Sequence, residues 1–230
     1  MFRVFVCSLI LFTLLGCARS GGSASSSRIA PLQQHSGAIV VDDVSYLLWL
    51  EQRTLRPVSM QVQVLDDDGQ RFEGAYIWRD GLLRELKQRG RREFNDEMRP
   101  FSLHVRYDTE GAPVFQRFRI GGQILPMKEL ELLRLYQEVE DGVAVVKRQA
   151  VDGFRLYQGV WKQGVLVSCS GNPFEVEFQP GEQMIPKEGE GIALLAKQRR
   201  LSGTNVLRNT QVIALLSDDV NCFKPTITLE

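Results

Sequence analysis

The sequence predicts a mainly β fold of the α+β class, in which an antiparallel meander sheet or half-barrel carries one long helix and a small C-terminal β subdomain. Three observations support this prediction. Apolar and polar residues alternate along much of the chain, turns rich in Gly and Asp separate the alternating runs, and one segment changes to helical spacing. Successive hairpins joined by tight turns are typical of an antiparallel meander.

The start of the sequence predicts an export signal. Arg3 precedes an apolar stretch from Val4 to Leu15, which is too short to span a bilayer because a transmembrane helix needs roughly 20 residues. The sequence Leu14-Leu15-Gly16-Cys17 resembles a bacterial lipobox. This resemblance implies that residues 1–16 are removed and that Cys17 carries a diacylglycerol and a further acyl chain such as palmitate. The alternative is an ordinary signal peptide cut elsewhere, with Cys17 incidental.

Residues 17–37 form a flexible tether in this interpretation. Ser, Gly, Gln and Ala predominate there, and few large apolar residues are present to offset the entropy of ordering. Position 18 is Ala, whereas the lipobox resemblance associates Asp at this position with retention at the inner membrane. We therefore expect a lipoprotein that is anchored in the outer membrane by its lipid and faces the periplasm.

Residues 38–173 are predicted to form the antiparallel β domain. In residues 58–78, Met60, Val62 and Val64 alternate with glutamines before an Asp-Gly turn reverses the chain. The same pattern recurs in residues 101–122 and, for a third time, in residues 153–169. The three copies predict three hairpins of one meander.

Residues 126–149 are predicted to form the long helix. Its apolar residues recur at helical spacing. Pro126 and two glutamates open the segment, and Lys147-Arg148 close it, so the charges suit the two ends of a helix dipole. Gly142 is a weak point or an early stop. The apolar stripe, which we expect to cover the inner face of the meander, consists of Leu132, Leu135, Tyr136, Val139 and Val143.

Residues 174–230 are predicted to form the C-terminal β subdomain, because Pro- and Gly-rich sequence precedes a further strand, turn and strand. Cys7 leaves with the signal and Cys17 carries lipid, so Cys169 and Cys222 remain in an oxidising compartment and are expected to pair. A bridge between them would stabilise the fold by about 4 kcal/mol in the chain-entropy model. The alternative is two buried free thiols.

Charge excludes one class of partner and suggests another. Removal of Arg3 with the signal leaves 27 of the 28 Lys and Arg residues against 28 Asp and Glu residues, a net charge near −1, whereas nucleic-acid binding needs a basic face.

The densest positive run is a candidate contact for phosphate headgroups or lipopolysaccharide. Its alternative is a soluble edge strand protected by charge. The run contains Arg84, Lys87, Arg89, Arg91 and Arg92.

No catalytic or metal-binding pattern emerges, so we predict a non-enzymatic protein without cofactor or metal. Asp66–Gly69 has the carboxylates of a calcium loop but lies between strands, as a hairpin turn does. His104 falls on the polar side of its strand. Ser168 lacks the Gly-x-Ser-x-Gly context of a hydrolase nucleophile. Glu175 and Glu177 share a strand face, where solvent-side alternation is commoner than a glycosidase pair.

Three hairpin segments carry a family resemblance. The sequences "AYIWRDG", "LHVRYDTEGAPVFQRFR" and "YQGVWKQG", together with the lipobox and the chain length, resemble the YjaH family of lipoproteins from enteric and Vibrio-like bacteria. The resemblance spans nearly the whole chain. It implies an envelope lipoprotein, and it brings neither an activity nor catalytic residues.

These observations lead to three hypotheses of function. The first is a non-enzymatic outer-membrane lipoprotein that binds a protein or another envelope component through a sheet surface. The second is a lipid or lipoprotein carrier, a half-barrel with a helical lid similar to the outer-membrane receptor for lipoproteins. The third and weakest, an envelope hydrolase, needs a polar cleft with convergent reactive groups. Whether residues 126–149 cover a hollow or a filled core distinguishes the carrier from the first hypothesis.

Overall fold

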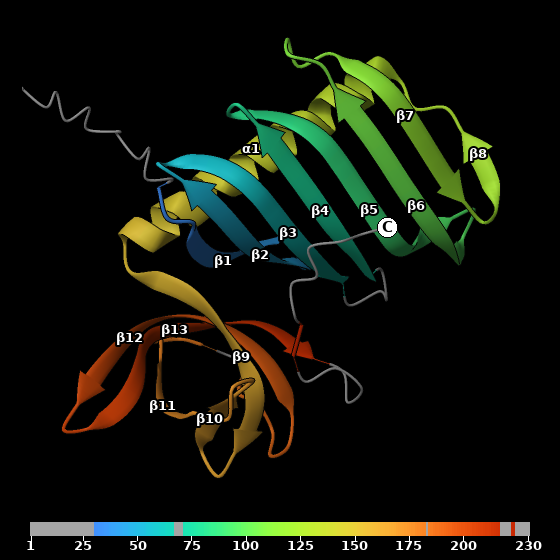
Figure 1. Cartoon of the computed structure of the whole chain (residues 1–230). Coiled ribbons are helices and arrows are strands. Elements are labelled where there is room, and N and C mark those ends of the chain that lie inside the picture. The colour runs from blue at the N-terminus through green and yellow to red at the C-terminus, as the bar shows by residue number, and fades with distance from the viewer. Residues whose placement is uncertain (1–29, 67–70, 183, 217–221, 224–230) are drawn as a thin grey trace, which may run out of the picture.

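The computed structural model describes residues 30–66, 71–182, 184–216 and 222–223. Over these residues the chain forms an eight-stranded antiparallel sheet, a helix and a closed five-stranded barrel (Figure 1). This arrangement confirms the predicted fold class. The predicted signal sequence, Cys17 and most of the predicted tether lie outside the described residues, as do Asp67, Asp68 and Gly69 of the turn considered for calcium.

The sheet is a meander in which every strand pairs with its neighbour in the chain. Two-residue turns join several strands, and Asp42, Asp43, Thr54 and Leu55 all have positive φ, as type I′ hairpin turns require. The first strand begins within the predicted tether, which therefore ends earlier than Gly37. The strands are β1 (Gln33–Val41), β2 (Val44–Arg53), β3 (Arg56–Asp66), β4 (Arg71–Arg79), β5 (Leu82–Phe94), β6 (Glu97–Tyr107), β7 (Pro113–Ile120) and β8 (Gln123–Leu125).

One face of the sheet, here called the inner face, packs against the helix. Leu48 of β2 and Val62 of β3 are paired in register, and both are buried in the same core cluster as Leu103 of β6. The residues that alternate with these along each strand point to the opposite face, here called the outer face, because successive side chains of a strand point to opposite sides of the sheet. The alternation read from the sequence therefore assigns the two faces.

The helix α1 (Glu129–Val151) lies along the inner face (Figure 1). It begins three residues later and ends two residues later than predicted. At its start the Lys128 N–H donates to Glu131 Oε2 at 2.7 Å. The helix does not stop at Gly142, which is buried against the sheet, where a Cβ would lie 3.3 Å from Met60 Cε. The absence of a side chain at Gly142 lets the helix approach the sheet closely.

The last turn of α1 also completes the edge strand β1. The Gln149 amide accepts from the Ala38 N–H at 3.0 Å and donates to the Ala38 carbonyl oxygen at 2.7 Å. Ala38 pairs with Leu47 through the other side of the strand. Gln149 thus supplies the hydrogen bonds that a further strand would make at this position.

We expect Gln149→Leu to lower the free energy of unfolding by about 2 kcal/mol, because two partly buried hydrogen bonds are lost. Gln137→Leu is the matched control: Gln137 lies on the same helix, is exposed and bonds to Asp141, and such a pair contributes about 0.5 kcal/mol or less. Chemical denaturation followed by circular dichroism measures both. Equal losses in the two variants would contradict this role of Gln149.

The remaining strands form the barrel, with the order β10-β11-β13-β12-β9. The predicted third hairpin, residues 153–169, belongs here and not to the meander, so the two units divide after α1 and not at residue 173. Alternation identifies a strand but does not identify the strand with which it pairs. In the structure β9 pairs with β12, with Val160 opposite Gly191 at one end and Phe154 opposite Lys197 at the other. The strands are β9 (Phe154–Lys162), β10 (Val165–Ser168), β11 (Pro173–Phe178), β12 (Gly191–Leu201) and β13 (Thr204–Leu216).

The barrel packs against the outer face of the sheet at β1 and β2. A buried cluster joins Ala38 and Leu47 of the sheet to Ala193 and Ile213 of the barrel. At the same junction Ser45 Oγ donates to the carbonyl oxygen of Ile213 at 2.6 Å. The sheet and the barrel therefore share one apolar interface.

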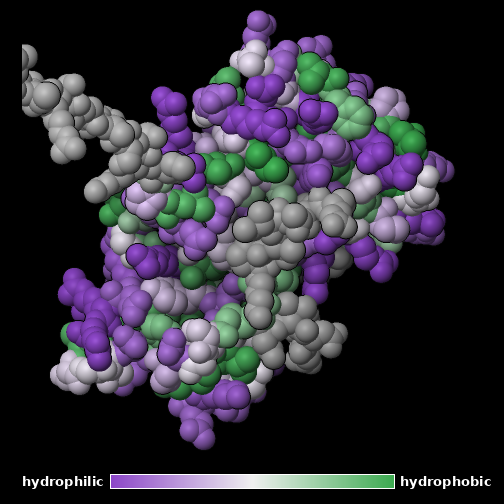
Figure 2. Space-filling model, in the orientation of Figure 1, coloured by the Kyte–Doolittle hydropathy of each residue, from purple (hydrophilic) through white to green (hydrophobic). Residues whose placement is uncertain are grey.

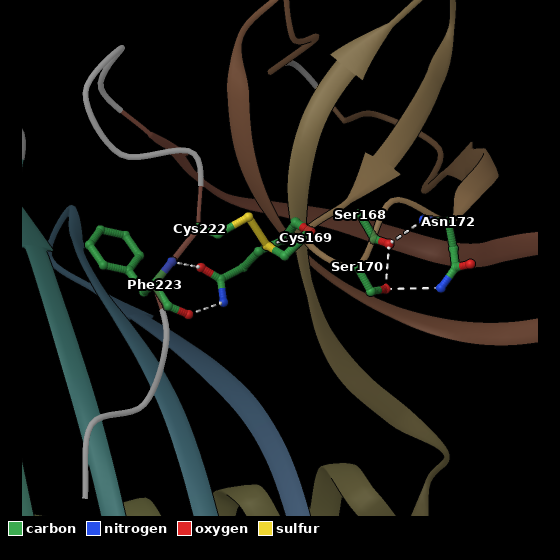
Figure 3. Close-up of a disulfide and its surroundings, with 7 residues drawn as sticks. Ser168, Cys169, Ser170, Asn172, Cys222 and Phe223 are labelled. Atoms are coloured by element: carbon green, nitrogen blue, oxygen red, sulfur yellow. Dashed lines mark hydrogen bonds between the residues drawn. A yellow bond between two sulfur atoms is a disulfide. The ribbon is translucent and has the colours of Figure 1, made fainter.

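A disulfide between Cys169 and Cys222 links residues 222–223 to the barrel (Figure 3), as predicted. Gln158 of β9 accepts from the Phe223 N–H at 2.9 Å and donates to its carbonyl oxygen at 3.2 Å. The Phe223 side chain packs on the cluster between the barrel and the sheet. The bridge therefore holds an apolar side chain at the junction of the two units.

Candidate binding cleft

The helix is fixed to one end of the inner face. Besides the Gln149 bonds to Ala38, three hydrogen bonds reach the ends of β4 and β6 and the turn between β2 and β3, which lie at the same end of the antiparallel sheet. At this end of the sheet Trp78, Leu83 and Tyr107 are buried in one core cluster with Leu132 of α1. The three bonds are Trp78 Nε1 to Glu140 Oε1 (2.8 Å), Tyr107 Oη to the Leu132 carbonyl oxygen (2.8 Å) and Lys147 Nζ to the Leu55 carbonyl oxygen (3.0 Å).

The opposite end of the inner face forms a cleft of about 620 Å³ along the flank of α1. The lining side chains come from the ends of β1, β3 and β5 and the starts of β2, β4 and β6, with one wall from the helix. Among these residues Val62 and Phe101 are buried, whereas Val44 and Phe72 are only partly covered. The apolar walls include Val44, Val62, Phe72 and Phe101 of the sheet and Leu135 and Val145 of α1.

Carboxylates stand on the cleft wall formed by β3 and α1. They belong to Asp66, Glu138 and Asp141. Although Glu138 reaches solvent, desolvation raises the pKa of its carboxyl group, Arg134 opposes this rise and Asp141 adds to it. Protonation of Glu138 therefore needs less acid than protonation of an isolated glutamate.

The remaining polar groups of the cleft lie deeper or toward β5. Burial raises the pKa of Tyr76, whose hydroxyl accepts from Gln88 Nε2 at 3.1 Å, so the phenol stays protonated at physiological pH. The Arg92 guanidinium lies over Phe101 and Phe118, 5.6 and 6.0 Å from their ring centroids. The cleft is thus largely apolar, with carboxylates and a cation at separate places.

The positive run predicted as one surface is divided by the structure. Lys87, Arg89 and Arg91 point to the outer face, in register with residues 104, 102 and 100 of β6. Arg92 lies on the inner face at the cleft, and Arg84 donates through Nε to the Tyr107 carbonyl oxygen at 2.9 Å. The five residues do not form a single patch, because adjacent residues of a strand point to opposite faces.

Pairing between strands adds residues that the sequence interpretation missed. Arg106 of β6 and Arg117 and Arg119 of β7 join the outer face beside β5, since His104 pairs with Arg117 and Ser102 with Arg119. The alternation in the sequence already contained this information, because all three arginines occupy its polar positions. The hairpin register was needed to place them beside the positive run.

The other candidate residues have structural partners. His104 Nε2 lies 2.7 Å from Glu85 Oε1 on the outer face, and Glu177 accepts from Arg208 Nε at 2.6 Å. Ser168 Oγ accepts from the Asn172 N–H in the turn beside the disulfide (Figure 3). Within the described part of the chain, no group of three or more His, Cys, Asp or Glu residues has an arrangement that could hold a metal ion.

Comparison with known proteins gives a family and no activity. Among the described residues, no helix is long and apolar enough to cross a membrane. No curated protein and no solved structure matches the chain. One family model, described as "Protein of unknown function (DUF1481)", matches residues 35–225. The match covers most of the chain and both structural units, so the protein belongs to the DUF1481 family.

Proposed function

We propose that this protein is a lipoprotein of the YjaH type, anchored in the outer membrane and facing the periplasm, that holds one acyl chain of an envelope lipid or lipoprotein in the cleft beside α1. The observation that supports this proposal is the cleft itself. It has apolar walls and a volume of about 620 Å³, within the range of roughly 300–1,000 Å³ typical of small-molecule sites. The second hypothesis from the sequence is therefore favoured over binding through a sheet surface.

The length of the cleft suits an acyl chain. Lining residues come from six successive strands, β1 to β6, which span about 24 Å at a strand spacing of about 4.8 Å. Two acyl chains end to end make up a hydrocarbon core of about 30 Å, so one chain needs about 15 Å. Each methylene moved from water into such a site contributes ~0.8 kcal/mol.

The chemistry of the lining favours binding over covalent catalysis. Its described residues include no Ser, Cys, His or Lys, which are frequent nucleophiles and bases of enzymes. Tyr46 and Tyr76 line the cleft, and burial is the largest cause that raises the pKa of each phenol. These hydroxyl groups therefore remain neutral hydrogen-bonding groups. The charged residues at the cleft are suited to the polar end of an amphiphile.

A direct test is native mass spectrometry of protein extracted from membranes in mild detergent. The spectrum should show a noncovalent adduct with the mass of a lipid, which disappears after denaturation while the covalent anchor remains. The delipidated protein should then bind a fluorescent fatty acid at one site. A protein that carries no adduct and does not bind the fatty acid would rule out the acyl-chain proposal.

We expect Val145→Trp to weaken binding of the fluorescent fatty acid about tenfold or more, because the indole would occupy the cleft. A tenfold change corresponds to about 1.4 kcal/mol, less than the contribution of two buried methylenes. Ala144→Trp is the matched control, since Ala144 is the preceding helix residue, is exposed and does not line the cleft. Equal weakening in both variants would place the fatty acid elsewhere.

A further inference from the structure

The outer face of β5–β7 carries a cluster of cations, here called the cationic face. Rows of side chains run across the three strands: Lys87, His104 and Arg117 form one row, and Arg89, Ser102 and Arg119 the next. With about 3.3 Å per residue and about 4.8 Å between strands, the face extends about 20 Å along the strands and about 10 Å across them. Its cations are Lys87, Arg89, Arg91, Arg106, Arg117 and Arg119.

The cations that β6 and β7 contribute to the cationic face are not neutralised within the described part of the chain. The carboxylates beside the cationic face belong to Glu73 and Glu85, which pair with Arg89 and Lys87, and Glu93 lies at its margin. Arg106, Arg117 and Arg119 are exposed, and no described carboxylate lies within ion-pair distance of them. In a chain with as many acidic as basic residues, this local excess of positive charge marks a surface for an anionic partner.

Apolar side chains lie between and beside these arginines. Phe115 pairs with Arg106 and is 41% exposed, and Ile124 of β8 pairs with Arg119 and is 62% exposed. In Figure 2, hydrophilic residues predominate where β5–β7 lie in Figure 1, with hydrophobic residues among them. Cations interspersed with exposed apolar groups suit the interface of a lipid bilayer, where headgroup phosphates and acyl chains are both within reach.

We propose that the cationic face docks on a membrane surface that contains anionic phospholipids. Arg106, Arg117 and Arg119 contact headgroup phosphates, while Phe115 and Ile124 enter the headgroup boundary. This inference does not depend on the cleft, which lies on the inner face. Docking through this face would turn the outer face of β5–β7 toward the bilayer.

Vesicle cosedimentation tests the proposal. The parent protein is the mature chain with Cys17→Ser, so that a covalent lipid does not contribute to binding. We expect it to sediment with vesicles of phosphatidylethanolamine and phosphatidylglycerol and to remain in solution with vesicles of phosphatidylcholine. Added salt should weaken the binding, because exposed charges are screened. A parent that does not bind the anionic vesicles, or binds both compositions equally, would overturn the proposal.

The triple variant Arg106→Gln, Arg117→Gln, Arg119→Gln should lower the partition coefficient about a hundredfold, since each basic residue near an anionic surface contributes about a factor of five. The corresponding triple Arg→Lys variant keeps the charges and should retain binding. Because Arg to Gln changes on an exposed face leave the core intact, circular dichroism should show an unchanged fold. Loss of binding in the Lys variant would count against an electrostatic contact.

The charge-matched control removes three exposed arginines of the barrel through Arg155→Gln, Arg199→Gln and Arg200→Gln. Vesicle binding should change little in this control, and equal losses in the two Gln variants would show that net charge alone attracts the vesicles. Binding of the parent to DNA or to an acidic protein, but not to vesicles, would also overturn the proposal. Val145→Trp should leave vesicle binding unchanged, which separates this test from that of the cleft.

Discussion

Loss of the bridge between Cys169 and Cys222 is expected to lower the free energy of unfolding by about 4 kcal/mol, as estimated for a loop of this length. The two cysteines are 53 residues apart in the sequence, and their Cα atoms lie 5.9 Å apart in the folded protein. A bond of this span restricts the unfolded chain strongly. Total stabilities of domains are of the order of 5–15 kcal/mol, so the loss would be a large part of the whole.

The structure also indicates which part of the fold would lose stability first without the disulfide. Phe223, next to the bridge, is held by the Gln158 amide and packs on the cluster shared by the barrel and the sheet. Without the bridge this segment is free to leave the junction. We therefore expect residues 174–230 to loosen more than residues 45–168, with proteolysis beginning in the segment from Gln179 to Gly191, most of which lies outside the strands.

Thermal and chemical denaturation of Cys222→Ser, and of the wild-type protein with and without reductant, measure the effect. Ser170→Ala is the matched control, because Ser170 is exposed beside the bridge and, among the residues that the structure describes, bonds only to Ser168 and Asn172 of its own turn. Free-thiol labelling of the folded, non-reduced protein gives an independent readout. Reaction of both cysteines, or equal stability of the variant and the wild type, would contradict the role assigned to the bridge.

Local periodicity was sufficient to predict the helix, several of the strands and which of their residues face the core. The helical stripe containing Leu132, Val139 and Val143 packs on the inner face as expected, because an apolar stripe must be buried whatever its partner is. Alternation likewise identified the hairpin over residues 153–169. It could not identify the partner strand, since pairing between β9 and β12 depends on residues that follow much later in the chain.

The cleft was beyond prediction from the pattern for a related reason. Val62 and Val64 are buried core residues that also line the cleft, and nothing in the alternation distinguishes them from core residues away from it. The position of α1 across the strands determines where the cleft lies. That position depends on individual side chains, among them Trp78 and Tyr107, which bond to the helix at one end of the sheet. Hydrophobicity indicates that a surface is covered, but not how completely.

Replacement of Cys17 by Ser is expected to have the largest effect on location: the protein should leave the outer-membrane fraction or accumulate as an unprocessed precursor. The lipobox interpretation requires a thiol at position 17 to receive the diacylglycerol, and a hydroxyl does not replace it. Membrane attachment through two or more acyl chains is stable, whereas weaker surface contacts are reversible. Fractionation of cells, with immunoblotting for the size difference caused by residues 1–16, measures both outcomes.

The proposed cationic face makes the washing conditions important in this experiment. Arg106, Arg117 and Arg119 would hold some non-lipidated protein at an anionic membrane in low salt, whereas a wash at high ionic strength shortens the Debye length to about 3 Å at 1 M and releases it. Cys7→Ser is the matched control, because it removes a thiol from the apolar part of the predicted signal and should leave anchoring intact. If the Cys17→Ser protein stays with the outer membrane after the high-salt wash, the anchor is not at Cys17.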